Sequence, residues 1–117
     1  MATENKEIEA VMEENEDDGL VVIKLQKTLD YNGVKYDTIK MDLENLTGRD
    51  SMDVENELMA RKKGTVIYGA LNNDYILGIA SKACAKAGLP LGTDAFLSLS
   101  LKDHNRLKEA VRNFLLK

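Results

Sequence analysis

The chain has 117 residues, a formal net charge of -4 and a single cysteine, which together indicate one domain without an internal disulfide. Aromatic residues make up only 5% of the sequence and tryptophan is absent, so a stacking platform for nucleobases is not expected. No apolar run is long enough to cross a membrane and the acidic N-terminus lacks the apolar core of a secretory signal, which favours a soluble protein of a reducing cytoplasm.

The first residues form an acidic leader. Residues 1–19 hold eight acidic side chains against one lysine, a net charge of -7, whereas residues 20–117 hold 12 acidic and 15 basic side chains, a net charge of +3. A segment with so few large apolar residues cannot bury enough surface to offset the entropy that it would lose on ordering. We therefore expect residues 1–19 to be disordered and residues 20–117 to form a single domain.

Residues 20–43 have the pattern of a β-hairpin. Asn32-Gly33 separates two alternating runs, and this dipeptide favours a type I′ turn because both turn positions need a positive φ. The register that follows pairs Tyr31 with Val34, Asp30 with Lys35, and Leu29 with Tyr36. One face of the hairpin is then apolar, and it needs a cover because two strands alone are only marginally stable in water.

The apolar residues of the second strand change phase along its length. They occupy even positions near the turn and odd positions from Ile39 onward, whereas the apolar residues of the first strand stay odd. One extra residue in a strand corrects such a change, so we expect a β-bulge near Asp37-Thr38. The resulting pairs would be Leu25 with Met41, Ile23 with Leu43, and Lys24 with Asp42.

Helical patterns occupy most of the rest of the chain, at about 48–63, 73–87, 93–99 and 101–116. Candidate N-caps precede or open each segment: Thr47 with Asp50, Asn72 or Asn73, Thr93, and Ser100 with Asp103. Gly88 is a candidate stop for the second helix. The basic side chains Lys102, Arg106, Lys108 and Arg112 are expected on the solvated faces of the last helix. The predicted fold is therefore α+β and mostly helical, with an N-terminal hairpin packed on three to four helices.

The segment Gly64–Leu71, "GTVIYGAL", is open to three interpretations. Its flanking glycines and apolar centre fit an exposed apolar loop, a third strand or a hinge.

No pattern of catalytic, cofactor-binding or metal-binding residues is found. The one histidine, His104, lies between Asp103 and Asn105, but adjacent residues of a helix do not face each other. Cys84 lies among alanines on an apolar helical face, which indicates core packing. The glycines match neither the P-loop nor the dinucleotide fingerprint. We therefore expect a protein that is not an enzyme.

The order of the parts resembles a known family. A hairpin runs into Leu46-Thr47-Gly48-Arg49-Asp50, a helix stops at Ala87-Gly88-Leu89-Pro90, and the chain closes on Asn113-Phe114-Leu115. In this order the parts are similar to those of the tail assembly proteins, or tail assembly chaperones, of tailed bacteriophages and prophages. The resemblance covers roughly residues 20–116 and leaves the acidic leader outside.

The resemblance implies a role in protein assembly. Such proteins coat the long tape measure protein and help to recruit tail tube subunits in the host bacterial cytoplasm. They tend to self-associate, and they are usually absent from the finished particle. The resemblance thus implies binding to the tape measure protein, the tail tube protein and other copies of the chain, with no cofactor, no membrane and no nucleic acid.

The expected protein-binding residues lie at the hairpin and in the apolar segment that follows the first helix. Open strand edges are templates for another chain, which favours partner binding at a hairpin edge together with the exposed part of "VIYGAL". The candidate residues are Ile67, Tyr68, Leu71, Tyr31, Val34 and Tyr36. Two alternatives are a small structural adaptor retained in the tail, and a regulatory nucleic-acid-binding protein that uses the basic last helix.

Overall fold

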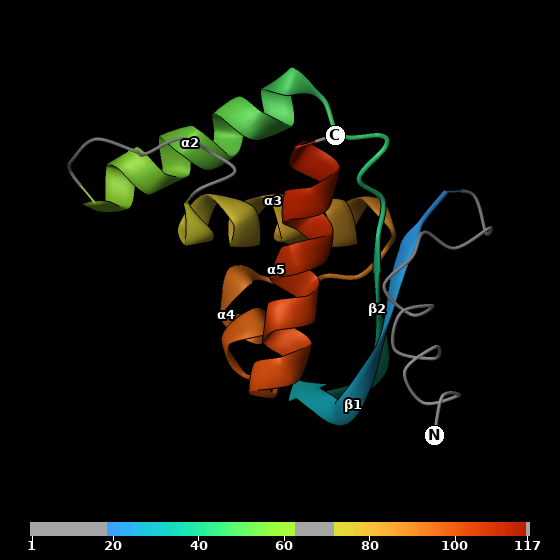
Figure 1. The fold of residues 1–117 in the computed structure, drawn as a ribbon. Coiled ribbons are helices and arrows are strands. Elements are labelled where there is room, and N and C mark those ends of the chain that lie inside the picture. Colours follow the sequence, from blue (N-terminus) through green and yellow to red (C-terminus); the bar gives the residue numbers. More distant parts are fainter. Residues whose placement is uncertain (1–18, 63–71, 117) are drawn as a thin grey trace.

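The structure is a computed structural model that describes residues 19–62 and 72–116. An antiparallel hairpin of β1 (Val21–Tyr31) and β2 (Val34–Met41) comes first. The helices α2 (Gly48–Lys62), α3 (Asn73–Lys86), α4 (Thr93–Leu97) and α5 (Leu101–Leu115) follow it (Figure 1). This arrangement confirms the predicted α+β fold, and each of these helices begins at the expected residue. The predictions for the leader up to residue 18 and for Gly64–Leu71 lie outside the described residues.

Local capping explains where these helices begin and end. The Asn72 side chain accepts a hydrogen bond from the backbone N–H of Tyr75 at 3.0 Å, which confirms Asn72 as the N-cap of α3. At the start of α2, the Thr47 N–H donates a hydrogen bond to the Asp50 carboxylate, as expected. At the start of α5, the Ser100 hydroxyl accepts a hydrogen bond from the Asp103 N–H, also as expected. The N-cap of α4 is Gly92 rather than Thr93, because the helix already begins at Thr93. Gly88, at a φ of 89°, ends α3 as predicted.

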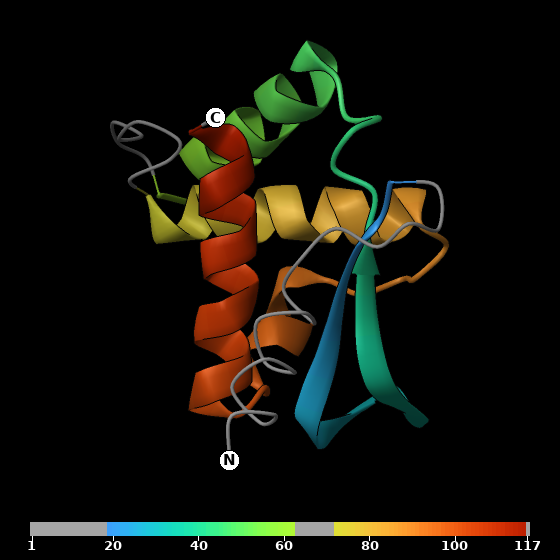
Figure 2. The same cartoon turned by 45° about the vertical axis from the view of Figure 1, so that its right-hand side comes forward.

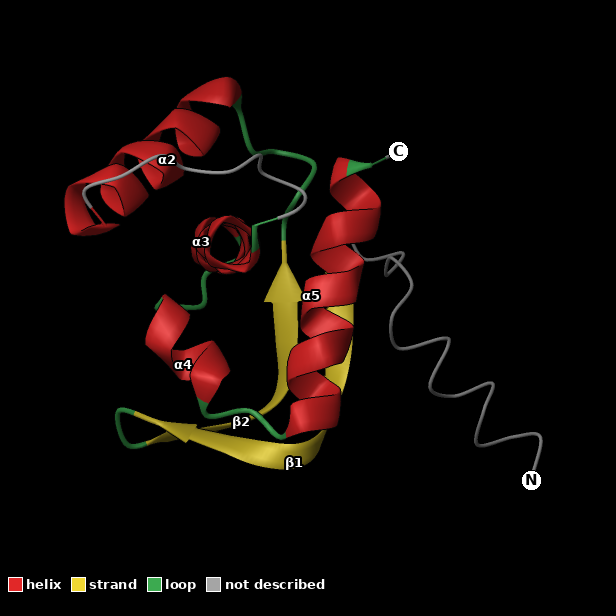
Figure 3. Cartoon of the chain, turned by 60° about the vertical axis from the view of Figure 1, so that its left-hand side comes forward, coloured by secondary structure: helices red, strands yellow, loops and turns green. Residues whose placement is uncertain are grey.

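Helix α3 lies at the centre of the fold. Figure 3, which looks along α3, shows α2, α4, α5 and β2 arranged around it, and each of these elements contacts α3. Apart from Tyr75, the residues that α3 places in the core are small or medium in size, and Ile76, Ala80, Ala83 and Cys84 are fully buried. The short side chains let neighbouring elements approach closely, and they explain how the apolar face of the hairpin is covered by the chain's own helices.

Helix α2 is held against α3 at one close approach. A Cβ placed on Gly78 would lie 2.5 Å from Val54 Cγ1, so a larger residue there would force Val54 to move. Val54 and Leu58 are each 1% exposed and supply the buried side of α2. The opposite side of α2 faces solvent.

The hairpin register is as predicted near the turn and different beyond it. Leu29 pairs with Tyr36, Asp30 with Lys35, and Tyr31 with Val34. Further out, Val21 pairs with Met41, Ile23 with Ile39, and Lys24 with Thr38. Residues 25–28 of β1 therefore lie opposite Asp37 alone, and the irregularity is an insertion in β1 rather than a bulge in β2. The predicted pairs Leu25 with Met41, Ile23 with Leu43 and Lys24 with Asp42 are wrong.

A buried ion pair of α5 explains why the insertion lies in β1. The Asp103 carboxylate accepts hydrogen bonds from Gln26 N–H at 3.0 and 3.1 Å and from Lys27 N–H at 3.2 Å. Arg106 donates one hydrogen bond to Asp103 Oδ1 and one to the Lys24 carbonyl, both at 2.8 Å. Backbone groups of β1 that the insertion removes from strand pairing thus form hydrogen bonds with side chains of α5.

The insertion bends the hairpin. Figure 2 shows the hairpin as a twisted pair of strands. Figure 3 shows its outer half behind α5, which contacts β1, and the half that carries the turn passing beneath α4. The bend brings the turn end of the hairpin to the same end of the molecule as α4 and the first turn of α5.

Candidate protein-binding surface

The turn end of the hairpin has the geometry that its sequence predicts. Asn32 and Gly33 have φ values of 53° and 80°, as a type I′ turn requires. Lys35 and Asp30 form an ion pair at 3.3 Å on the polar face of the hairpin. On the opposite face lie Leu29, Tyr31, Val34 and Tyr36, because each cross-strand pair places its two side chains on one side of the sheet.

The solvent exposure of this apolar face increases from the core toward the turn. Leu29 is 2% exposed, Tyr31 and Tyr36 are half-buried, and Val34 is 49% exposed. Of the six residues predicted to bind protein, the structure thus brings Tyr31, Val34 and Tyr36 together at the turn. The other three, Ile67, Tyr68 and Leu71, lie outside the described residues.

Tyr31 ties the turn end of the hairpin to α4. Its hydroxyl donates a 2.9 Å hydrogen bond to Asp94 Oδ1. The hydrogen bond to Asp94 and its nearby negative charge favour the neutral phenol and raise the pKa of Tyr31 above 10.0. This long-range contact joins two surface elements that are far apart in the sequence.

Helix α4 adds an exposed leucine to the same end of the fold. Phe96 is fully buried and Leu97 is 70% exposed, because neighbouring residues of a helix point in different directions. Leu97 lies one helical turn after Asp94, the residue that Tyr31 contacts. Leu101, which opens α5, is 74% exposed. We call Tyr31, Val34, Tyr36, Leu97 and Leu101 the tip patch.

The candidate binding residues selected from the sequence did not include Leu97 or Leu101. Helix α4 buries Ala95 and Phe96 but leaves Leu97 exposed, so the adjacent residues Phe96 and Leu97 are divided between the core and the surface.

Helix α2 carries a second apolar surface. Met52 and Met59 are 62% and 49% exposed, and their spacing of two turns places them on one side of the helix. A separate groove of about 430 Å³, which neither methionine lines, runs along another side of α2 next to α3 and α4. It is lined by Val54, Glu57, Leu58, Ala60, Arg61, Gly78 and Thr93. The unbranched thioether side chains suit a surface that adapts to its partner.

The cysteine and the histidine, Cys84 and His104, have structural roles in the described part of the chain. Cys84 is fully buried, and burial raises the pKa of its thiol to about 12. His104 Nδ1 lies 2.8 Å from the Phe96 carbonyl, a contact that joins α5 to α4. Within residues 19–62 and 72–116, no cluster of three or more potential metal-ligating side chains is present.

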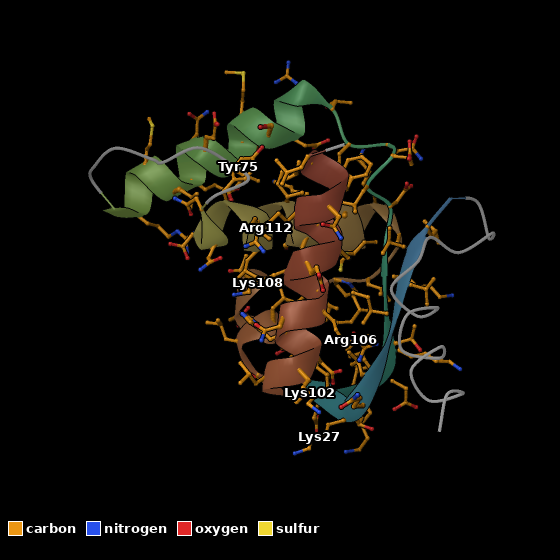
Figure 4. All side chains as sticks on the ribbon, in the orientation of Figure 1. Lys27, Tyr75, Lys102, Arg106, Lys108 and Arg112 are labelled. Atoms are coloured by element: carbon orange, nitrogen blue, oxygen red, sulfur yellow. The ribbon has the colours of Figure 1, made fainter. Side chains whose placement is uncertain are left out.

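The basic residues of α5 do not form the solvated stripe that was predicted. Arg106 is only 8% exposed, and both of its terminal nitrogens donate within the fold. Lys102 is exposed, while Lys108 and Arg112 are half-buried (Figure 4). The burial of Arg106 therefore removes one charge from the surface that a nucleic acid would contact.

Comparisons with known proteins identify no relative. No family model, curated protein or solved structure matches this chain. Among the described residues, none of the helices is long and apolar enough to span a membrane.

Proposed function

We propose that this protein is a phage tail assembly chaperone that acts without catalysis in the host bacterial cytoplasm. It binds the tape measure protein, helps to recruit tail tube subunits, and is absent from the mature virion. Two lines support the proposal: the order of sequence motifs, and the apolar side chains exposed on rigid elements at one end of the fold. The tip patch is the observation that carries it.

The chemistry of the patch suits an apolar helical partner. Val34, Leu97 and Leu101 expose aliphatic surface, and Tyr31 adds an aromatic ring whose hydroxyl is already bonded to Asp94. A tape measure protein is a long helical chain that would aggregate through its apolar faces before the tail tube encloses it. Patches of this kind mark protein interaction sites because exposed apolar surface is costly in water.

The proposal is tested by co-expression with the tape measure protein encoded nearest to this gene. The chain should keep that protein soluble and should co-purify with it. Val34→Ser together with Leu97→Ser should abolish both effects, because the two changes remove the most exposed aliphatic groups of the hairpin turn and α4. Leu116→Ser is the matched control, since Leu116 is 64% exposed at the opposite end of α5.

Three results would change the assignment. If the folded double variant still keeps the tape measure protein soluble, the binding surface lies elsewhere, and Met52→Ser with Met59→Ser tests α2 next. If the wild-type chain binds no tape measure protein, the chaperone function is wrong. If purified particles contain the chain in stoichiometric amount by mass spectrometry, it is a structural adaptor instead.

Self-association is part of the same proposal. The described residues form a two-stranded sheet, so the outer edge of β2 pairs with no other strand among them. Sedimentation across a range of concentrations measures this association. A chain that stays monomeric at every concentration would remove self-association from the proposal.

A further inference from the structure

Four exposed lysines surround the bend of the hairpin. They are Lys24, Lys27, Lys40 and Lys102, and we call them the lysine face. Lys35, Lys82 and Arg106 form ion pairs, whereas these four lysines form none with the described residues. The lysine face is therefore a group of positive charges without ion-pair partners in the described part of the chain.

The hairpin register brings two of these lysines together, and the hydrogen bonds of Asp103 with the β1 backbone bring the other two together. Lys24 pairs with Thr38 and Val22 pairs with Lys40, which makes Lys24 and Lys40 diagonal neighbours on the outer face of the sheet. Lys27 donates its backbone N–H to Asp103, the residue next to Lys102. Figure 4 shows Lys27 and Lys102 close to each other at the base of α5.

The acidic side chains around the lysine face neutralise only part of its charge. Asp103 is fully buried and paired with Arg106, and Asp30 is paired with Lys35. Asp37, Asp42 and Glu44 remain, so four lysines against three carboxylates leave a net charge of +1.

The acidic leader has the charge and the length to reach this surface. Residues 1–18 hold eight acidic side chains against one lysine, a net charge of -7, and they join the described chain at Gly19. Lys27 lies about 20 Å along β1 from Val21 at the usual strand rise. Eighteen extended residues span up to about 60 Å, so the leader can cover the whole lysine face.

We propose that the lysine face is the docking surface for the chain's own acidic leader. Each exposed ion pair contributes only about 0–1 kcal/mol, but several pairs form in parallel and the short tether keeps the leader at a high effective concentration. The leader then covers the outer face of the hairpin and leaves the tip patch open. Because the contact depends on charge, it is loose and sensitive to salt.

The test uses a spin label on the full chain. Glu9→Cys introduces one reactive thiol, because Cys84 is fully buried and its thiol pKa is raised to about 12. At low salt the label should broaden the amide signals of Lys24, Lys27 and Lys40, and it should leave those of Met52 and Met59 unchanged. At about 1 M salt the broadening should disappear, because the screening length falls to about 3 Å.

Two matched variants complete the experiment. Changing the other seven leader acids to their amides should abolish the broadening, as should changing the four lysines to glutamine in a chain whose circular dichroism shows that it is folded. Broadening that persists in either variant, or that affects α2 equally, would overturn the proposal. Broadening that arises only between labelled and unlabelled copies in a mixed sample would overturn it too, because the leader would then dock on a second copy.

Discussion

Asp103 and Arg106 lie one turn apart on α5 and form a 2.8 Å ion pair, and together they bind the backbone of β1 where its ladder is interrupted. The two side chains are 0% and 10% exposed. The pair therefore replaces a stretch of strand pairing with contacts to a helix, and it sets the bend that places the hairpin turn beneath α4.

Removal of Asp103 should destabilise the fold strongly. Asp103→Ala leaves the Arg106 charge buried and the N–H groups of Gln26 and Lys27 without their acceptor, at an expected cost of about 3–5 kcal/mol in the free energy of unfolding. Urea denaturation measures this cost. Glu109→Ala, an exposed acid on the same helix, should change stability by no more than about 0.5 kcal/mol.

The double variant tests whether the two residues act as a pair. Asp103→Ala with Arg106→Ala removes both charges, so its cost should be clearly less than the sum of the two single costs. Additive costs would show that the ion pair contributes nothing beyond the separate contacts of each side chain.

Gly78 and Gly48 should respond to alanine in opposite directions. A Cβ on Gly78 would lie 2.5 Å from Val54 Cγ1, whereas a Cβ on Gly48 has no neighbour within 4 Å. Gly78→Ala should therefore displace α2 and cost about 1–3 kcal/mol. Gly48→Ala should stabilise by about 0.4–1 kcal/mol, because it restricts the unfolded chain. Thermal unfolding compares the two, and a harmless Gly78→Ala would contradict the close packing of α2 on α3.

The Tyr31 contact predicts a dependence of stability on high pH. The neutral phenol donates to Asp94, so the folded-state pKa of Tyr31 lies above 10.0 while that of the unfolded chain does not. This contribution to stability is fully present below the unfolded pKa and is lost as pH rises through the folded pKa.

Asp94→Asn should lower the pKa of Tyr31, because it removes the negative charge beside the hydroxyl. The difference in ultraviolet absorbance between each chain and its Tyr31→Phe counterpart isolates the ionisation of this one tyrosine. A Tyr31 pKa that stays unchanged in Asp94→Asn would show that the hydrogen bond does not form in solution.

Cys84 should be a probe of unfolding. Its thiol is 0% exposed and has a pKa raised to about 12, so a thiol reagent at neutral pH should react only when the core opens. The reaction rate should rise with urea in parallel with unfolding. As a control, Asn56→Cys in a Cys84→Ala chain should react at once, because Asn56 is exposed on α2. Fast reaction of Cys84 in the native chain would contradict its burial.

Features that depend on neighbouring residues could be predicted from the sequence. The turn at Asn32-Gly33, the cap at Asn72 and the stop at Gly88 each follow from the conformations and hydrogen bonds of residues close in the chain. The apolar phases of the two strands also required an irregularity in the hairpin. They could not show which strand would contain it, because an insertion in either strand restores the alternation.

The tertiary structure decided the rest. Asp103 lies 77 residues from Gln26, and no local pattern distinguishes a carboxylate that caps a helix from one that binds a distant strand. For the same reason Arg106 was predicted to be solvated and is buried. The sequence by itself determined the elements and the residues at which the helices begin, since these depend on short-range geometry. Only packing determined which strand is interrupted and which leucines stay exposed, because those outcomes depend on partners that the fold brings together.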